Sequence, residues 1–309
     1  MKILLLGCQG QVGWELQRSL APLGEVLALG RHAAQNPQGL HGDLADPEAL
    51  VRTVQAVGPQ VIVNAAAYTA VDKAESETAL AHTVNAAAPA ALAHAATQLG
   101  AWLVHYSTDY VFNGQGEQAW RETDATGPLS VYGASKLAGE EAVRSTPRHL
   151  VLRTSWVYAA RGGNFAKTML RLARERDALQ VVSDQFGAPT GADLLADVTA
   201  HCLRQLLGPT AAQGDDPARL AGVYHCAPAG ETSWHGYACH VLQQAQRLGC
   251  ALKAGPEQVR PIGTADFPTP ARRPHNSRLD TSLLRIRFGL HLPHWQAGVN
   301  RMLEEVLAA

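Results

Sequence analysis

The chain has no block of charge of a single sign, and this absence argues against several classes of function. Its 309 residues include 26 basic and 27 acidic side chains, which gives a formal net charge of -1. Nucleic acids and anionic membranes attract proteins through clustered positive charge, so we expect no nucleic acid and no membrane as a partner. With 46% hydrophobic and 17% charged residues, the composition is typical of a globular enzyme rather than a disordered chain.

Long apolar runs and paired cysteines are also missing. The opening segment from Met1 to Gly7 is too short for the apolar core of a signal peptide, and no apolar run approaches the length that crosses a bilayer. The five cysteines are odd in number and widely spaced, with no C-x-x-C pair. Because that pattern is typical of reduced thiols, we expect a cytoplasmic protein.

Histidine and cysteine come close together in one stretch of the second half. His235, Cys239 and His240, with His225 and Cys226 nearby, could be read as metal ligands. A structural zinc site needs four ligands at suitable spacings, and this stretch has no paired spacing that supplies them. We therefore expect packing or surface roles for these side chains and no metal site here.

Short apolar runs alternate with longer helical patterns through the first half. Near-continuous apolar character is what a parallel strand covered on both faces requires. The predicted strands are Lys2–Leu6, Val26–Leu29, Val61–Val63, Trp102–Tyr106 and Leu150–Leu152, and the predicted helices between them are Val12–Leu20, Pro47–Val57, Ala79–Leu99 and Tyr132–Val143. This alternation predicts an α/β fold of the Rossmann type with a doubly wound parallel sheet.

The alternation weakens in the second half, where Gly- and Pro-rich loops at Asp184–Gly191 and Ala254–Pro274 interrupt the helical patterns. We predict two regions from this change. Residues 1–153 would form an NAD(P)-binding Rossmann domain, and residues 154–309 a smaller, mainly substrate-binding region interleaved with returns to the sheet. The stretch 213–217 is predicted to be a surface loop rather than a linker.

Three glycines follow the first predicted strand and open the first predicted helix. Gly7, Gly10 and Gly13 would allow a tight turn, close approach of the backbone to a pyrophosphate, and close packing of helix on strand. The helix N-terminus at Gln11 and Val12 would offer free N–H groups and partial positive charge to the phosphates. A plain glycine turn is the alternative, but a strand before it and a helix after it favour a dinucleotide site.

The end of the second predicted strand indicates which dinucleotide fits. A carboxylate there would bind the ribose 2′-OH of NAD and repel a 2′-phosphate. The sequence has Arg31 instead, so we predict NADPH as cofactor, with NADH as the second choice; a solvated surface arginine is the alternative reading. The other predicted cofactor contacts lie near the adenine or the ribose: Asp43, Leu44, Ala65, Ala66 and Ala67.

A phenol and an ammonium stand four residues apart at Tyr132 and Lys136, so they share one face of a helix. A free tyrosine titrates near ~10, and we expect the lysine charge to lower that pKa toward neutrality. Thr108, at the carboxyl end of a predicted strand, could add a hydroxyl that binds a substrate oxygen. A surface pair is the default for an isolated Tyr-x-x-x-Lys, but its place about one βα unit after Thr108 favours catalysis.

Seven segments along the chain carry a resemblance to a known family. They are residues 7–13, 64–75, 107–112, 132–140, 153–158, 184–190 and 272–277. In these segments the sequence resembles the dTDP-4-dehydrorhamnose reductases, which are extended short-chain dehydrogenases/reductases. The first and fourth segments are shared with many relatives, whereas the second, fifth and last are more specific to this group.

The resemblance implies NAD(P)H-dependent reduction of the C4 keto group of a dTDP-sugar, dTDP-4-dehydro-L-rhamnose, to dTDP-L-rhamnose. It implies that Tyr132 donates the proton, that Lys136 holds the nicotinamide ribose, and that Thr108 orients the sugar carbonyl. The substrate contacts that it implies or suggests are Thr108, Asp109, Trp156 and Gln185, with Arg273 or Arg272 at the diphosphate and Asn276 as a further candidate.

Some members of that family form homodimers linked by magnesium. Glu304 and Glu305 are a weak hint of such acids here, and surface carboxylates are the simpler reading. Two other functions stay open at this point. One is a nucleotide-sugar epimerase or dehydratase, which would not consume its nicotinamide cofactor. The other is a non-catalytic regulatory subunit like that of methionine adenosyltransferase, which keeps much of the cofactor-binding signature.

Overall fold

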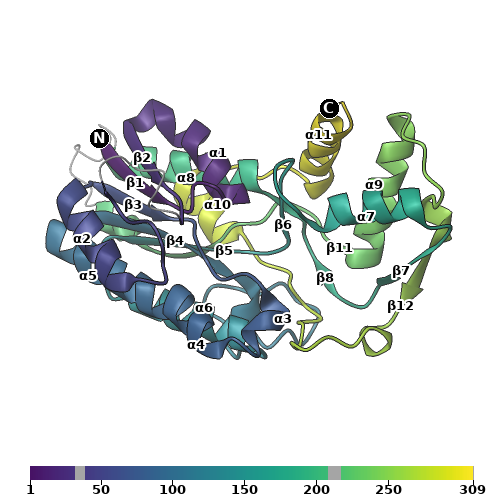
Figure 1. Ribbon diagram of the computed structural model, residues 1–309, viewed down its shortest axis with the longest axis horizontal. Coiled ribbons are helices and arrows are strands. Elements are labelled where there is room, and N and C mark those ends of the chain that lie inside the picture. The colour runs from purple at the N-terminus through teal and green to yellow at the C-terminus, as the bar shows by residue number, and fades with distance from the viewer. Residues whose placement is uncertain (32–38, 208–216, 309) are drawn as a thin grey trace.

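The computed structural model describes residues 1–31, 39–207 and 217–308, so part of the predicted surface loop, residues 213–216, lies outside it. A six-stranded parallel sheet has the strand order β10-β5-β4-β3-β1-β2 (Figure 1). Its strands are β1 (Lys2–Leu6), β2 (Glu25–Leu29), β3 (Val61–Asn64), β4 (Trp102–Thr108), β5 (His149–Thr154) and β10 (Gly222–His225). The predicted doubly wound α/β fold is confirmed.

Helices cover both faces of this sheet. On one face lie α1 (Gln11–Leu20), α8 (Ala192–Leu207) and α10 (Ser282–Phe288); on the other lie α2 (Pro47–Val57), α5 (Ala88–Leu99) and α6 (Val131–Arg144) (Figure 1). Successive residues of β1 serve the two faces in turn: Ile3 and Leu5 join the core under α1, and Leu4 and Leu6 the core under α2. This is why the strand reads as continuously apolar.

A smaller lobe has its own apolar core, at the right of Figure 1. Its helices are α7 (Phe165–Glu175), α9 (Trp234–Arg247) and α11 (Trp295–Leu307). Short strand pairs connect them: β6 (Val157–Tyr158) with β9 (Thr190–Gly191), β7 (Leu179–Val182) with β12 (Val259–Ile262), and β8 (Phe186–Gly187) with β11 (Thr232–Ser233). Between visits to this lobe the chain returns to the sheet through α8, β10 and α10.

The helix predicted over Ala79–Leu99 is irregular. It consists of α4 (Thr78–His82), a π-helical turn over Thr83–Ala87, and α5, and it follows the short helix α3 (Val71–Ala74). Within the π turn, Asn85 accepts a hydrogen bond from the backbone N–H of Tyr68 at 2.8 Å and donates to the Ser135 hydroxyl at 3.0 Å. The wider turn thus ties α6 to the segment that follows β3.

Among the described residues, no helix combines the length and the apolar composition that a membrane crossing needs.

Candidate active site

The glycine turn after β1 is closed by contacts that leave no room for side chains. Gly7 has φ +83°, and a Cβ there would lie 2.7 Å from the backbone nitrogen of Ala66. A Cβ on Gly13 would lie 2.0 Å from the carbonyl oxygen of Gly7, while Gly10 donates its N–H to that same oxygen at 3.0 Å. The predicted glycine positions are therefore required sterically, and the turn packs on the Ala65–Ala66 backbone that follows β3.

Helix α1 presents an open N-terminus beside this turn. Its N-cap is Gly10, and no side chain among the described residues caps it. The first N–H groups of a helix have no partner within the helix and carry partial positive charge. Gln11, in the first turn, accepts a hydrogen bond from the side chain of Asn164 at 3.4 Å. The end of α1 therefore fits a pyrophosphate, and the loop before α7 reaches it.

Arg31 follows β2 and is not free of partners. Its Nε lies 3.7 Å from a carboxylate oxygen of Asp43, and its side chain is 61% exposed. Leu44, next to Asp43, is buried under the sheet. The three residues predicted to surround the adenosine end thus lie together beyond β2, with the guanidinium accessible.

The catalytic candidates come from neighbouring elements at the carboxyl edge of the sheet. Thr108 ends β4, which pairs with β3 and β5. Tyr132 lies in the first turn of α6, whose N-terminus is fixed because the Ser130 hydroxyl accepts from the N–H of Gly133 at 3.2 Å. The Thr108 side chain interacts with the Tyr132 phenol and lowers its pKa, so the two side chains face the same space. The structure therefore brings the predicted threonine and tyrosine together at this edge of the sheet.

The electrostatics of Tyr132 differ from the sequence prediction. Burial raises the pKa of Tyr132 to about 12, against the lowering effect of its interaction with Thr108. The Lys136 Nζ instead donates to the carbonyl oxygen of Tyr106 at 2.6 Å and lies 3.3 Å from Nε2 of His105. The predicted lowering of the Tyr132 pKa by Lys136 is wrong for this arrangement, because desolvation dominates and the ammonium is directed elsewhere.

Lys136 itself is perturbed in the direction that burial requires. Burial lowers the pKa of Lys136 to about 8, while the nearby Glu140 carboxylate raises it. Glu140 is occupied by the guanidinium of Arg153, whose Nε lies 3.0 Å from its carboxylate. Lys136 therefore loses its proton far more readily than a surface lysine.

Asp109 is a buried carboxylate beside Thr108. One oxygen accepts from the Thr108 hydroxyl at 3.1 Å, and an interaction with Ser277 also favours the ionised carboxylate. The other oxygen, Oδ2, has no partner among the described residues. Burial raises the pKa of Asp109 to about 6. A carboxylate with one unsatisfied oxygen can accept a hydroxyl from a polyol such as a sugar.

The remaining predicted substrate residues lie where the two lobes meet. Among the described non-glycine residues, only Trp156 has a positive φ, of +50°. Its ring stacks on Trp234 with ring centroids 3.7 Å apart. Arg273 pairs with Asp72 at 2.8 Å, and its Nε is buried without a partner in the described part of the chain. Gln185 is buried and donates to the Thr264 hydroxyl at 3.1 Å.

Two other residues from the last of the resembling segments have different surroundings. Asn276 is buried and donates to the carbonyl oxygen of Gln118 at 2.7 Å, so it holds the loop before α6 in place. Arg272 is exposed. Of the two arginines offered for the diphosphate, Arg273 is the one directed inward.

Sequence reasoning missed several polar residues of this site. His105 is a buried partner of Lys136, Asn64 is a buried partner of His105, and Ser277 reaches Asp109 from a segment far along the chain. For His105 a signal was available, since a histidine inside an apolar strand is unusual. For Ser277 none was, because its proximity depends on the path of the C-terminal segment.

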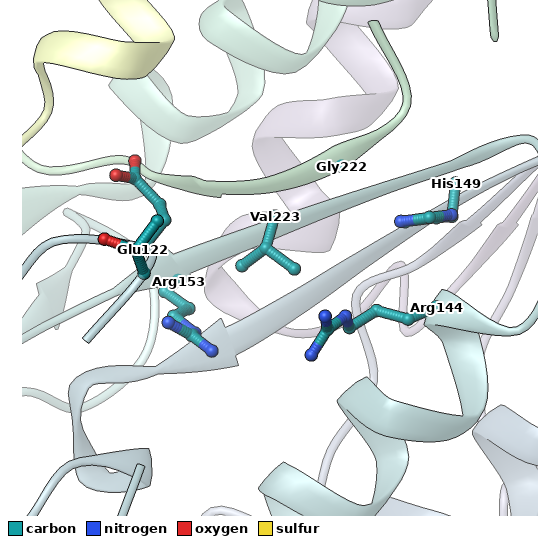
Figure 2. A pocket seen from close by; sticks show the side chains of 7 residues that line it. Glu122, Arg144, His149, Arg153, Gly222 and Val223 are labelled. Carbon is teal, nitrogen blue, oxygen red and sulfur yellow. The ribbon is translucent and has the colours of Figure 1, made fainter. Parts of the chain in front are cut away.

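A cavity of about 320 Å³ opens elsewhere, against β5 and β10 (Figure 2). Its lining residues are Glu122, Thr123, Arg144, His149, Arg153, Gly222 and Val223. Arg144 ends α6 whereas Tyr132 lies in its first turn, so about 18 Å of helix separates them at 1.5 Å per residue. Arg153, which pairs with Glu140, lines this cavity, and none of the catalytic candidates does.

Metal ligands do not gather in the described ranges: no group of three or more His, Cys, Asp or Glu side chains is placed to hold an ion. His235 and Cys239 lie within 3.7 Å of each other on α9, and Glu305 pairs with Arg301 at 3.3 Å on α11. The magnesium expectation thus finds no support in this fold.

Comparison with known proteins agrees with this geometry. A family model described as the RmlD substrate binding domain matches residues 1–308. The dTDP-4-dehydrorhamnose reductase of Shigella flexneri is 54% identical over 307 residues, covering 99% of this chain and 98% of the relative.

Two solved structures share the whole fold. A dTDP-4-dehydrorhamnose reductase from Clostridium acetobutylicum superposes with a TM-score of 0.86 at 33% identity, covering 99% of this chain and 100% of the other. One from Bacillus anthracis, in complex with NADP, gives a TM-score of 0.83 at 33% identity, with 98% and 99% covered. The predicted resemblance is confirmed. The chain therefore belongs to the RmlD substrate binding domain family, together with these dTDP-4-dehydrorhamnose reductases.

Proposed function

We propose that this chain is an NAD(P)-dependent oxidoreductase that reduces the C4 keto group of dTDP-4-dehydro-L-rhamnose to dTDP-L-rhamnose. One observation carries the proposal: Thr108 at the end of β4 and Tyr132 in the first turn of α6 interact at the carboxyl edge of the sheet, the edge that also holds the glycine turn. Because β1, β3 and β4 are neighbours, the segments after them lie side by side. A ketone against the two hydroxyls is therefore close to the path of a dinucleotide.

The residues present fit NADPH at this edge. Gly7, Gly10 and Gly13 form a turn without side chains, and Gln11 and Val12 open a helix whose N–H groups suit the pyrophosphate. Arg31, exposed beside Asp43, would pair with the 2′-phosphate. Leu44 and the Ala65–Ala67 backbone would contact adenine and ribose. When bound, NADPH supplies the hydride, and NADH would be the weaker cofactor.

The sugar nucleotide would lie between the two lobes. Asp109 Oδ2 would accept a sugar hydroxyl, and the Trp156 ring would line the same space with Gln185 behind it. Arg273 would bind the diphosphate, since a guanidinium matches phosphate oxygens. Residues 1–153 would then bind the cofactor, and residues 154–309 would mainly bind substrate. Three elements of the second region, α8, β10 and α10, pack with the sheet.

The reaction needs a proton at the sugar oxygen as hydride reaches C4. The Thr108 and Tyr132 hydroxyls would hydrogen-bond that oxygen and hold the carbonyl in one orientation. Tyr132 then gives its phenolic proton to the forming alkoxide. A pKa of about 12 suits this step, because the phenol keeps its proton at neutral pH until a more basic alkoxide develops. Lys136, whose Nζ is directed at the Tyr106 carbonyl rather than at the phenol, would hold the nicotinamide ribose.

Replacement of Tyr132 by phenylalanine tests the assignment. With dTDP-4-dehydrorhamnose generated in place, we expect Tyr132→Phe to lose at least ~100-fold in NADPH oxidation rate, the lower range for a lost general acid. NADPH binding, measured by fluorescence titration, should remain. Tyr110, whose ring packs edge-on against Tyr132 at 5.4 Å, gives a matched control, and Tyr110→Phe should turn over almost normally. Near-normal turnover of Tyr132→Phe would refute the proposal.

The same assay separates the alternative functions. A reductase consumes one NADPH for each product molecule, whereas an epimerase or dehydratase shows no net oxidation. A regulatory subunit shows no turnover with the sugar at all. The homodimer and its magnesium link stay predictions, and light scattering with Mg²⁺ or with chelator checks both.

A further inference from the structure

Three buried polar side chains form a chain behind the catalytic candidates. Asn64 ends β3 and lies opposite His105 of β4 in the parallel register. The Asn64 amide nitrogen is 3.2 Å from Nδ1 of His105, and Nε2 of His105 is 3.3 Å from Nζ of Lys136. Asn64 and His105 are each 1% exposed and Lys136 is 3% exposed. Each ring nitrogen of a buried imidazole needs a hydrogen-bond partner. The partners in this chain therefore determine which nitrogen of His105 carries the hydrogen.

The far end of the chain fixes which ring nitrogen of His105 carries the hydrogen. The backbone N–H of Ala66 donates to Oδ1 of Asn64 at 3.2 Å. That bond orients the amide, so its NH₂ group faces Nδ1 of His105. A nitrogen that faces a donor must present its lone pair. The neutral ring therefore carries its hydrogen on Nε2, and that N–H points at Lys136.

We propose that His105 is a positioning residue for Lys136: Asn64 and Ala66 lock it in the Nε2–H tautomer, and this N–H makes the amine of Lys136 easier to deprotonate. The inference deepens the proposed function and rests on it for the role of Lys136. An N–H directed at Nζ is a hydrogen bond only when the lysine is a neutral amine, and it repels an ammonium. The Tyr106 carbonyl, 2.6 Å from Nζ, accepts from either form.

Among the groups around Nζ of Lys136, His105 is the one that can be either a hydrogen-bond donor or an acceptor. On α6, Glu140 favours the ammonium, but its charge is shared with Arg153 of β5, and Tyr132 is neutral. From β4 come His105 and the Tyr106 carbonyl, with Asp109 beyond Thr108. The depressed pKa of His105, lowered by burial and by Lys136, agrees with a ring that stays neutral. The tautomer of His105 thus decides whether Nζ of Lys136 faces an N–H group or a lone pair.

The tautomer can be read directly, without any enzymatic turnover. In protein labelled with ¹⁵N at its 13 histidines, long-range ¹H–¹⁵N spectra distinguish protonated from unprotonated ring nitrogens. The His105→Gln variant identifies the signals. We expect Nε2 protonated and Nδ1 bare at pH 7. A ring protonated at Nδ1 would overturn the inference, even if the protein proves to be the proposed reductase.

A substitution at Asn64 should reverse the tautomer. In Asn64→Asp both carboxylate oxygens accept, so one keeps the Ala66 N–H and the other takes a hydrogen from Nδ1 of His105. Nε2 then presents a lone pair to the ammonium of Lys136. We expect the alkaline limb of the turnover rate to move up by at least about one pH unit relative to the unchanged protein, because the lone pair on Nε2 stabilises the ammonium of Lys136. His105→Leu should move it in the same direction by less.

A control and the opposing outcomes complete the test. His149→Asn changes a histidine on β5 that contacts the Thr146 carbonyl and not Lys136, so its alkaline limb should not move. Thermal unfolding checks that each variant is folded. An unshifted limb in folded Asn64→Asp and His105→Leu, or a shift equally large in His149→Asn, would contradict the positioning role. The expected tautomer without reductase turnover would refute only the proposed function.

Discussion

Replacement of Asp109 by asparagine should stabilise the protein at alkaline pH while it damages activity. Asp109 is 2% exposed, and its Oδ2 has no partner among the described residues. Burial raises the pKa of its carboxyl from 3.8 to about 6. A group whose pKa is raised on folding binds its proton more tightly in the native state, so ionised Asp109 opposes folding above pH 6.

The magnitude follows from the size of that shift. One pKa unit corresponds to 1.36 kcal/mol, so a shift from 3.8 to about 6 makes the ionised carboxylate unfavourable by about 3 kcal/mol at pH 8. An asparagine side chain at this position would be neutral at every pH. We therefore expect Asp109→Asn to gain up to about 3 kcal/mol relative to the unchanged protein at pH 8, less whatever its unpaired amide costs, and little at pH 4.

Urea unfolding at several pH values between 4 and 8 measures this difference. The advantage of the variant should grow mainly between pH 4 and pH 6, the interval between the unfolded and the folded pKa. Asp177→Asn, the same chemical change at an exposed aspartate, should show no such growth. A stability difference that does not vary with pH would refute the reasoning. Turnover should fall about 10-fold or more, as for a lost hydrogen bond to a charged group.

Three other substitutions test separate parts of the structure. His225 is fully buried, and its pKa is lowered from 6.5 to about 3. The free energy of unfolding should therefore fall as the pH drops below 6.5, by about 2 kcal/mol at pH 5. His225→Gln should reduce that loss in urea midpoints, and an unchanged loss would count against a neutral buried ring. Gly13→Ala places a Cβ 2.0 Å from the Gly7 oxygen. We expect NADPH affinity in a fluorescence titration to fall at least ~5-fold, as about 1 kcal/mol of overpacking implies. Gly163→Ala, with open space around its Cβ, should bind NADPH normally. Arg31→Ala should weaken NADPH binding by about 10-fold and NADH binding hardly at all, since only NADPH has a 2′-phosphate. Equal weakening of both would contradict the role assigned to Arg31. Arg52→Ala is the surface control.

Local chemistry explains why the cofactor half of the fold was predictable. The turn after β1 needs glycine because Gly7 has positive φ and Gly13 touches the Gly7 carbonyl oxygen. Each of these constraints acts within a few residues, so it leaves a mark in the sequence. The alternating burial of β1 on two helix layers does the same.

Features that depend on distant contacts left no such mark. The strand β10 is only four residues long and joins the sheet beside β5 after a long excursion through the smaller lobe. The strained backbone of Trp156 and its stacking on Trp234 depend on the docking of α9. The pKa of Tyr132 was predicted in the wrong direction for the same reason. A lysine four residues away is visible in the sequence, whereas the burial that outweighs it is not.

The distribution of polar groups along the sheet connects stability with function. At the amino ends and middle of the strands, residues such as Ile3, Ile62 and Leu103 are fully buried hydrocarbon. At the carboxyl ends of β4 and β5, the Ser107 and Thr154 hydroxyls and Asp109 Oδ2 are buried without partners in the described structure. Each such group costs about 1–3 kcal/mol. All strands of a parallel sheet end at one edge, so the fold concentrates these unfavourable groups where a polar ligand can satisfy several at once. A bound sugar nucleotide should therefore raise the unfolding temperature by more than its affinity for any one residue suggests.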